Sequence, residues 1–234
     1  MNPAYLQFGV LLALTMALVG IFVRKRQSEC WMLPVNLAVV LAWDSAQALF
    51  PEQLFHWRIY VIQQWIYNFC IFGVALELAR RAFKAFPGAA ATARVVFLAI
   101  LVVTALSIFA ATPPGNARSS TSFSVAAVLS LQPRLINATI WLFVATARLV
   151  MFFNVPVSDW HRSISLGFSI YLVISVTLLN LLKTFGFDIR SFVNFFDGSA
   201  YLALCCWFAL RAWQPEEATE LIPDSVRRLA AARA

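Results

Sequence analysis

The chain has 234 residues, of which 61% are hydrophobic and only 12% are charged. Soluble domains carry about 25% charged residues, so this composition excludes an ordinary soluble domain and indicates a multi-pass membrane protein. The formal net charge is +7, but most basic residues flank apolar stretches, where they determine membrane topology. We therefore expect the lipid bilayer, and no nucleic acid, as a partner, and a location in a cell membrane such as a bacterial inner membrane.

Apolar stretches of bilayer length follow one another along the chain and predict an all-α bundle of seven transmembrane helices, because each span needs about 20 apolar residues. The spans are expected at residues 5–23, 31–50, 59–78, 95–111, 131–152, 163–183 and 191–211. Residues 1–213 then form one transmembrane domain, and residues 214–234 form a short amphipathic tail.

The stretch between the fourth and fifth spans, SFSVAAVLSL, is too short to cross a membrane. We expect it to lie on the surface or to extend the fifth helix. Pro133 follows it and predicts a kink or a break, because proline removes a backbone donor and clashes with the preceding turn.

The distribution of Lys and Arg predicts the orientation. With the N-terminus outside, 13 of the 18 basic residues fall on the inner side, from Arg24 to the three arginines of the tail. The outer side receives Arg58, Arg118, Arg134, Lys183 and Arg190. Because basic residues are retained in cytoplasmic loops, we expect an outer N-terminus and a cytoplasmic C-terminus.

Polar residues recur at helical spacing within five of the spans and predict inward-facing sides, because residues three or four apart share a helix face. The candidate ligand-binding residues are Asp44, Gln47, Gln64, Asn68, Arg134, Asn137, Trp141, Lys183, Asp197 and Tyr201. The first and fourth spans carry few polar side chains, so we expect them at the lipid-facing periphery.

Asp44 and Asp197 are expected at nearly the same depth, toward the outer face. Counting at 1.5 Å per residue places each about 10 Å from the outer edge of the hydrocarbon core. Arg134, Lys183 and Arg58 are close enough in depth to serve as their counter-ions. Two alternatives stay open: a buried network that fixes helix packing, or an outward-opening polar pocket lined by aromatic side chains.

The sequence contains none of the common catalytic or metal-binding motifs, such as HExxH, GxSxG or a phosphate-binding glycine loop. We therefore expect no enzymatic activity and no metal site, and the sequence specifies no cofactor. The last span lacks a lysine, which excludes a rhodopsin-type Schiff base. His56 and His161 are expected in loops on opposite faces, which excludes paired haem ligation.

Three functions remain as hypotheses. The first is a sensor or receptor-like binding module that takes a small or amphiphilic ligand in its outer half and signals through a membrane or cytoplasmic protein partner. The second is a non-catalytic subunit or assembly factor of a larger membrane complex. The third is a small-solute transporter, although the chain shows no convincing internal repeat.

Overall fold

A computed structural model describes residues 3–54, 56–84, 95, 122–152 and 158–215. Within these ranges the chain forms α-helices and two short 3-10 helices, with no β-strand. The helices are α1 (Pro3–Val23), α2 (Met32–Leu49), α3 (Pro51–Leu54), α4 (Trp57–Lys84), α6 (Ser122–Phe152), α7 (Asp159–Phe185) and α8 (Arg190–Trp213).

The all-helical membrane fold is confirmed in its main features. Five of the described helices are long and apolar enough to cross a membrane. These segments are Tyr5–Val23, Met32–Leu49, Val61–Ala82, Asp159–Leu182 and Arg190–Trp213. The fourth expected span, 95–111, lies outside the described residues apart from Val95.

The fifth expected span corresponds to α6, which begins at Ser122 instead of 131. The apolar stretch before Pro133 thus extends this helix, and α6 continues across Pro133 without a break. Because the helix continues past Pro133, few backbone groups are left without a hydrogen bond. An unpaired backbone group is most costly in an apolar environment.

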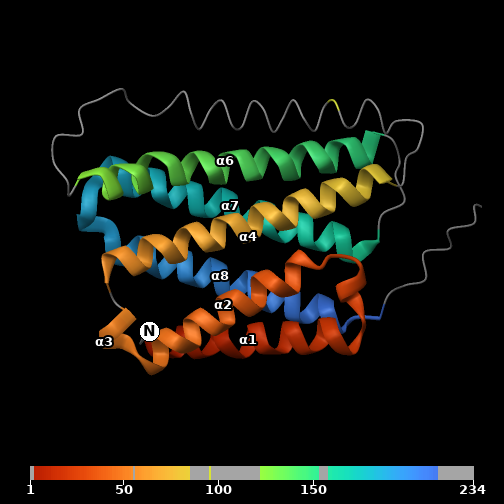
Figure 1. The fold of residues 1–234 in the computed structure, drawn as a ribbon, viewed down its shortest axis with the longest axis horizontal. Coiled ribbons are helices and arrows are strands. Elements are labelled where there is room, and N and C mark those ends of the chain that lie inside the picture. The colour runs from red at the N-terminus through yellow and green to blue at the C-terminus, as the bar shows by residue number, and fades with distance from the viewer. Residues whose placement is uncertain (1–2, 55, 85–94, 96–121, 153–157, 216–234) are drawn as a thin grey trace, which may run out of the picture.

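The long helices lie side by side along one axis (Figure 1). Their contacts close a ring in the order α1, α2, α4, α6, α7, α8 and back to α1, and α4 also touches α7 across it. The interior of the ring is therefore packed with side chains. In Figure 1, α4 and α6 run in the same direction, whereas α2 and α7 run the opposite way.

The two ends of the bundle differ in charge. We call one end the basic end, where α1 and α4 finish, α2 and α7 begin, and α8 finishes near residue 213. It carries Arg24, Lys25, Arg26, Arg80, Arg81, Arg162 and Arg211. We call the other end, which holds the start of α1 and the end of α2, the opposite end.

Small residues allow α1 and α8 to approach closely. A Cβ atom on Gly20 of α1 would lie 2.9 Å from the Cβ of Ala212 on α8 and 2.9 Å from Nε1 of Trp213. The same indole nitrogen donates a hydrogen bond to the carbonyl of Met16 at 3.1 Å. Membrane helices pack in this way because their association depends on close van der Waals contact.

Candidate functional site

A chain of four hydrogen-bonded side chains joins α2 to α4 near the opposite end. Gln47 donates to the side-chain oxygen of Gln63 at 3.0 Å, and Gln63 donates to the hydroxyl of Tyr67 at 3.0 Å. Tyr67 in turn donates to Oδ1 of Asp44 at 3.1 Å. We call these four residues the polar cluster. Each link has normal hydrogen-bond geometry, so the cluster fixes the register of α2 against α4.

Asp44 and Asp197 lie at the same level of the bundle, on α2 and α8. Gln7 of α1 donates to the backbone carbonyl of Asp44 at 3.5 Å. Its neighbour Leu6 lies against Gly198, because a Cβ atom there would be 2.7 Å from the Leu6 side chain. Adjacent residues of α1 therefore touch α2 beside Asp44 and α8 beside Asp197.

Buried polar atoms without a hydrogen-bond partner occur at this same level. Among the described residues they include Nε1 of Trp43, the Oδ1 oxygen of Asp197, whose side chain also interacts with Ser175, and the hydroxyl of Tyr201, which faces only the weakly accepting thiol of Cys205. The Tyr201 hydroxyl lies within electrostatic range of Asp44 and Tyr67. Buried polar groups are normally paired. Further unpaired atoms lie elsewhere in the described bundle, and these three are distinguished by their place beside the polar cluster.

The expected pairing of the two aspartates with basic residues is not observed among the described side chains. The only ion pair found there joins Arg81 and Glu77. Asp44 instead accepts its hydrogen bond from Tyr67. Arg134 is partly buried, and its Nη1 atom has no partner. The side chains of Lys183 and Arg58 lie outside the described residues.

The polar side of α6 faces outward, which differs from the expected inward face. Asn137 is exposed, and 68% of Trp141 is exposed. The buried side of α6 carries Leu142, Phe143 and Thr146. Thr146 satisfies its hydroxyl within the helix, by donating to the carbonyl of Leu142 at 2.7 Å. Polarity alone was therefore a poor guide to the face of this helix.

On α4 the expected residues were Gln64 and Asn68. Asn68 is buried and Gln64 is half-buried. Gln63 was not among the expected residues, yet it is 6% exposed and links the polar cluster. Its position one helical turn before Tyr67 was the available signal, because side chains four residues apart face the same way.

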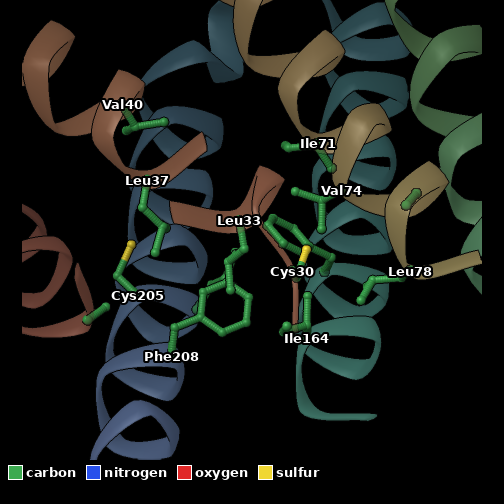
Figure 2. Packing of buried hydrophobic residues seen from close by; sticks show 14 of the residues in the cluster. Cys30, Leu33, Leu37, Val40, Ile71, Val74, Leu78, Ile164, Cys205 and Phe208 are labelled. Carbon is green, nitrogen blue, oxygen red and sulfur yellow. The ribbon is translucent and has the colours of Figure 1, made fainter. Parts of the chain in front are cut away.

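An apolar layer separates the polar cluster from the basic end. Leu33, Leu37 and Val40 of α2 are at most 3% exposed. They converge with Val74 of α4 and Phe208 of α8, as Figure 2 shows. These side chains belong to a single hydrophobic core, within which Asn36 of α2 is a buried polar residue.

At the basic end, the carboxylate of Glu77 on α4 holds the first turn of α2. It accepts hydrogen bonds from the backbone amides of Trp31 at 3.0 Å and Met32 at 2.7 Å. It also pairs with Arg81 at 2.7 Å and faces the thiol of Cys30 at 3.4 Å. We call this set of contacts the Glu77 clamp. Glu77 was not among the expected residues, although an acid one turn before a basic residue is visible in the sequence.

The segment between α1 and α2 folds over the basic end and contacts three other helices. Arg26 is 7% exposed and stacks 5.0 Å above the ring of Trp160 on α7. It also donates to the carbonyl of Gln214 after α8. His161 is 8% exposed in the first turn of α7, so the expectation that it lies in a loop is wrong. Its ring is enclosed because α7 begins at Asp159.

The part of the chain that the structure describes contains no group of three His, Cys, Asp or Glu side chains able to hold a metal ion. Protein-family models, curated proteins and solved structures contain no match to this chain.

Proposed function

We propose that this chain is a seven-helix membrane sensor that binds a small ligand beside the polar cluster and signals through a protein partner at the basic end. The observation that carries the proposal is the group of unpartnered buried atoms on Trp43, Asp197 and Tyr201. Leaving such an atom unpaired costs roughly 1 to 3 kcal/mol, which a ligand with matching groups recovers.

The chemistry of these atoms favours a ligand that carries both donors and acceptors. The indole nitrogen of Trp43 only donates, an ionised Asp197 only accepts, and the hydroxyl of Tyr201 does both. Tyr171 packs against Tyr201 with ring centroids 5.5 Å apart and adds an aromatic surface. A few polar groups within an apolar lining are typical of small-molecule sites. We infer a small or amphiphilic ligand that enters from the membrane face at the opposite end.

The helices α2 and α4 provide the route for the signal. Each carries two residues of the polar cluster, and both reach the Glu77 clamp at the basic end. A ligand that shifts α2 against α4 therefore also acts on the clamp, provided that it binds the two arrangements with different affinity. With the N-terminus outside, the basic end and residues 214–234 face the cytoplasm and offer a docking surface to an acidic partner.

The test is a thermal-shift screen of the purified full chain with small polar and amphiphilic compounds. Compounds that stabilise the wild type should also stabilise Asn137→Ala, which alters an exposed side chain. They should lose their effect in Asp197→Asn and Tyr201→Phe, which alter the unpartnered atoms. Equal stabilisation of all four proteins would place the binding elsewhere and refute the proposal.

A second candidate is a subunit of a larger membrane complex, and one surface favours it. Phe192, Phe195 and Phe196 are each about half exposed at the start of α8. Their rings contact one another: Phe192 and Phe196 are tilted with centroids 4.4 Å apart, and Phe195 meets Phe196 edge to face at 5.8 Å. In a membrane such a patch packs against acyl chains in a lone protein and against partner helices in a subunit. Mild solubilisation of native membranes tests this candidate. A subunit should migrate as part of a larger complex, and Phe192→Ala/Phe196→Ala should weaken that complex. A lone sensor should migrate as a monomer.

A further inference from the structure

A groove lies between α7 and α8, away from the polar cluster, and has a volume of about 340 Å³. Its walls are almost entirely apolar. Residues that line it include Gly167, Ile170, Tyr171, Ala200, Ala203 and Trp207. We call it the α7–α8 groove. Its residues belong to two membrane-spanning segments, so it opens toward the lipid.

Two arginines continue the walls of the groove toward the basic end. Arg162, Leu166 and Ile170 follow one another at every fourth position on the exposed side of α7. Ala203, Trp207 and Arg211 do the same on α8. Residues at this spacing share a helix face. Both positive charges therefore stand at the same end of the groove.

These charges are available to an anion. Arg211 stacks 4.7 Å above the ring of Trp207 and donates to the neutral side chain of Gln214 at 2.8 Å. Arg162 is exposed. Asp159 lies one turn before Arg162 on α7, and neither arginine forms an ion pair with a described carboxylate. An apolar groove that ends at two such guanidinium groups is electrostatically complementary to an anionic lipid.

We propose that the α7–α8 groove binds one anionic phospholipid of the leaflet at the basic end, with an acyl chain in the groove and the phosphate at Arg162 and Arg211. The lengths agree with this. From Arg162 to Ile174 the helix rises about 18 Å at 1.5 Å per residue, and one leaflet contributes about half of a 30 Å hydrocarbon core. The small side chains of Ala200 and Ala203 leave room for the chain along α8, whereas Gly167 lets α8 pack closely on α7.

Native mass spectrometry of the delipidated full chain tests the proposal, with dioleoyl phosphatidylglycerol and dioleoyl phosphatidylcholine titrated separately. We expect one tightly retained phosphatidylglycerol and weaker retention of phosphatidylcholine. Because each arginine near the membrane surface contributes roughly fivefold, Arg162→Gln/Arg211→Gln should lower phosphatidylglycerol retention about thirtyfold. The matched control is Arg24→Gln/Arg80→Gln, which removes two exposed arginines of the same end and should retain the lipid.

A second variant tests the groove itself. Ala203→Phe fills it from an exposed position, so the fold should persist while retention of both lipids falls. Equal retention of the two lipids by the wild type, or unchanged retention in Ala203→Phe, would overturn the proposal. If Ala203→Phe instead dissociates a dimer and leaves lipid retention unchanged, the occupant is a helix of a second copy and the lipid assignment is wrong.

Discussion

Glu77 accepts a hydrogen bond from the backbone amide of Met32 at 2.7 Å, which ties the end of α4 to the start of α2. The first amides of a helix have no partner within the helix, and an acidic group beside them is stabilising. The same carboxylate pairs with Arg81. The Glu77 side chain thus stabilises the start of α2, the last turns of α4 and the connection from α1 to α2 at Cys30 and Trp31.

Glu77→Ala should lower the free energy of unfolding by about 2 to 4 kcal/mol, because it leaves two amides without an acceptor and Arg81 with only the carbonyl of Ser28. Glu77→Gln should cost less, because its amide oxygen still accepts one of these bonds. Unfolding in SDS, followed by circular dichroism, measures both. The control is Glu52→Ala on α3, an exposed acid that should change little. A loss as small as that of the control would show that the clamp does not stabilise the fold.

The thiol of Cys30 lies between the first two spanning segments and should react slowly with maleimide. Burial, aided by the charge of Glu77, raises its pKa from 9.0 to about 12. At neutral pH the reactive thiolate is then roughly a thousandfold scarcer than for an ordinary thiol. The alkylation rate should keep rising tenfold per pH unit above pH 9, up to about 12. A rate that levels off near pH 9, measured in Cys70→Ser/Cys205→Ser/Cys206→Ser, would contradict this.

The raised pKa of Cys30 also makes stability depend on pH. The folded state keeps the thiol protonated, whereas the unfolded chain loses the proton above pH 9.0. Stability from this group is therefore complete below pH 9.0 and falls between pH 9.0 and about 12. Cys30→Ala should flatten the stability curve in that interval. An unchanged slope in Cys30→Ala would assign the alkaline loss to other groups.

Tyr67→Phe should destabilise the bundle by about 1 to 3 kcal/mol. The hydroxyl accepts from Gln63 and donates to Asp44, so its removal leaves two polar groups of the interior unpaired. Asp44→Asn should cost less, because an amide oxygen can still accept from Tyr67. Thermal unfolding in detergent measures both, with Tyr5→Phe as the control because Tyr5 is 71% exposed. Equal effects of Tyr67→Phe and Tyr5→Phe would mean that the polar cluster contributes no stability.

The sequence was sufficient to predict helices of bilayer length, because uninterrupted apolar stretches of that length are visible in it, and five such helices occur among the described residues. It was also sufficient to place Asp44 and Asp197 at one level, because the rise per residue is constant along a helix. Side-chain partners were harder to predict. Among the described side chains Asp44 accepts a hydrogen bond from Tyr67 and pairs with no base, since the neighbours of a half-buried carboxylate depend on how α2 and α4 are rotated about their axes.

The buried face of α6 was also predicted incorrectly from the sequence. Trp141 and Asn137 suggested a polar inner face, yet both are exposed. Thr139 is buried instead and bonds to the carbonyl of Leu135 at 2.8 Å. A threonine that satisfies itself within its own helix has little cost in the interior, so a count of polar residues does not reveal which face is buried.

Because α1 packs closely on α8, we expect alanine substitutions at two glycines of α1 to change stability in opposite directions. A Cβ atom on Gly20 would lie 2.9 Å from Ala212, whereas one on Gly9 would lie 3.4 Å from Leu202. Alanine at either position gains up to about 1 kcal/mol in helix propensity. Only Gly20→Ala must also push the helices apart, which typically costs about 1 to 3 kcal/mol.

We therefore expect Gly9→Ala to keep or raise the melting temperature and Gly20→Ala to lower it, in parallel thermal scans of the purified chain. Both variants make the same substitution in the same helix facing the same partner, so the effect of helix propensity cancels. The difference between their melting temperatures therefore measures the contact with α8. Gly20→Ala should also weaken the hydrogen bond from Trp213 to the carbonyl of Met16, which a shift in tryptophan fluorescence detects. If both variants move the melting temperature in the same direction by the same amount, α1 does not pack on α8 at this distance.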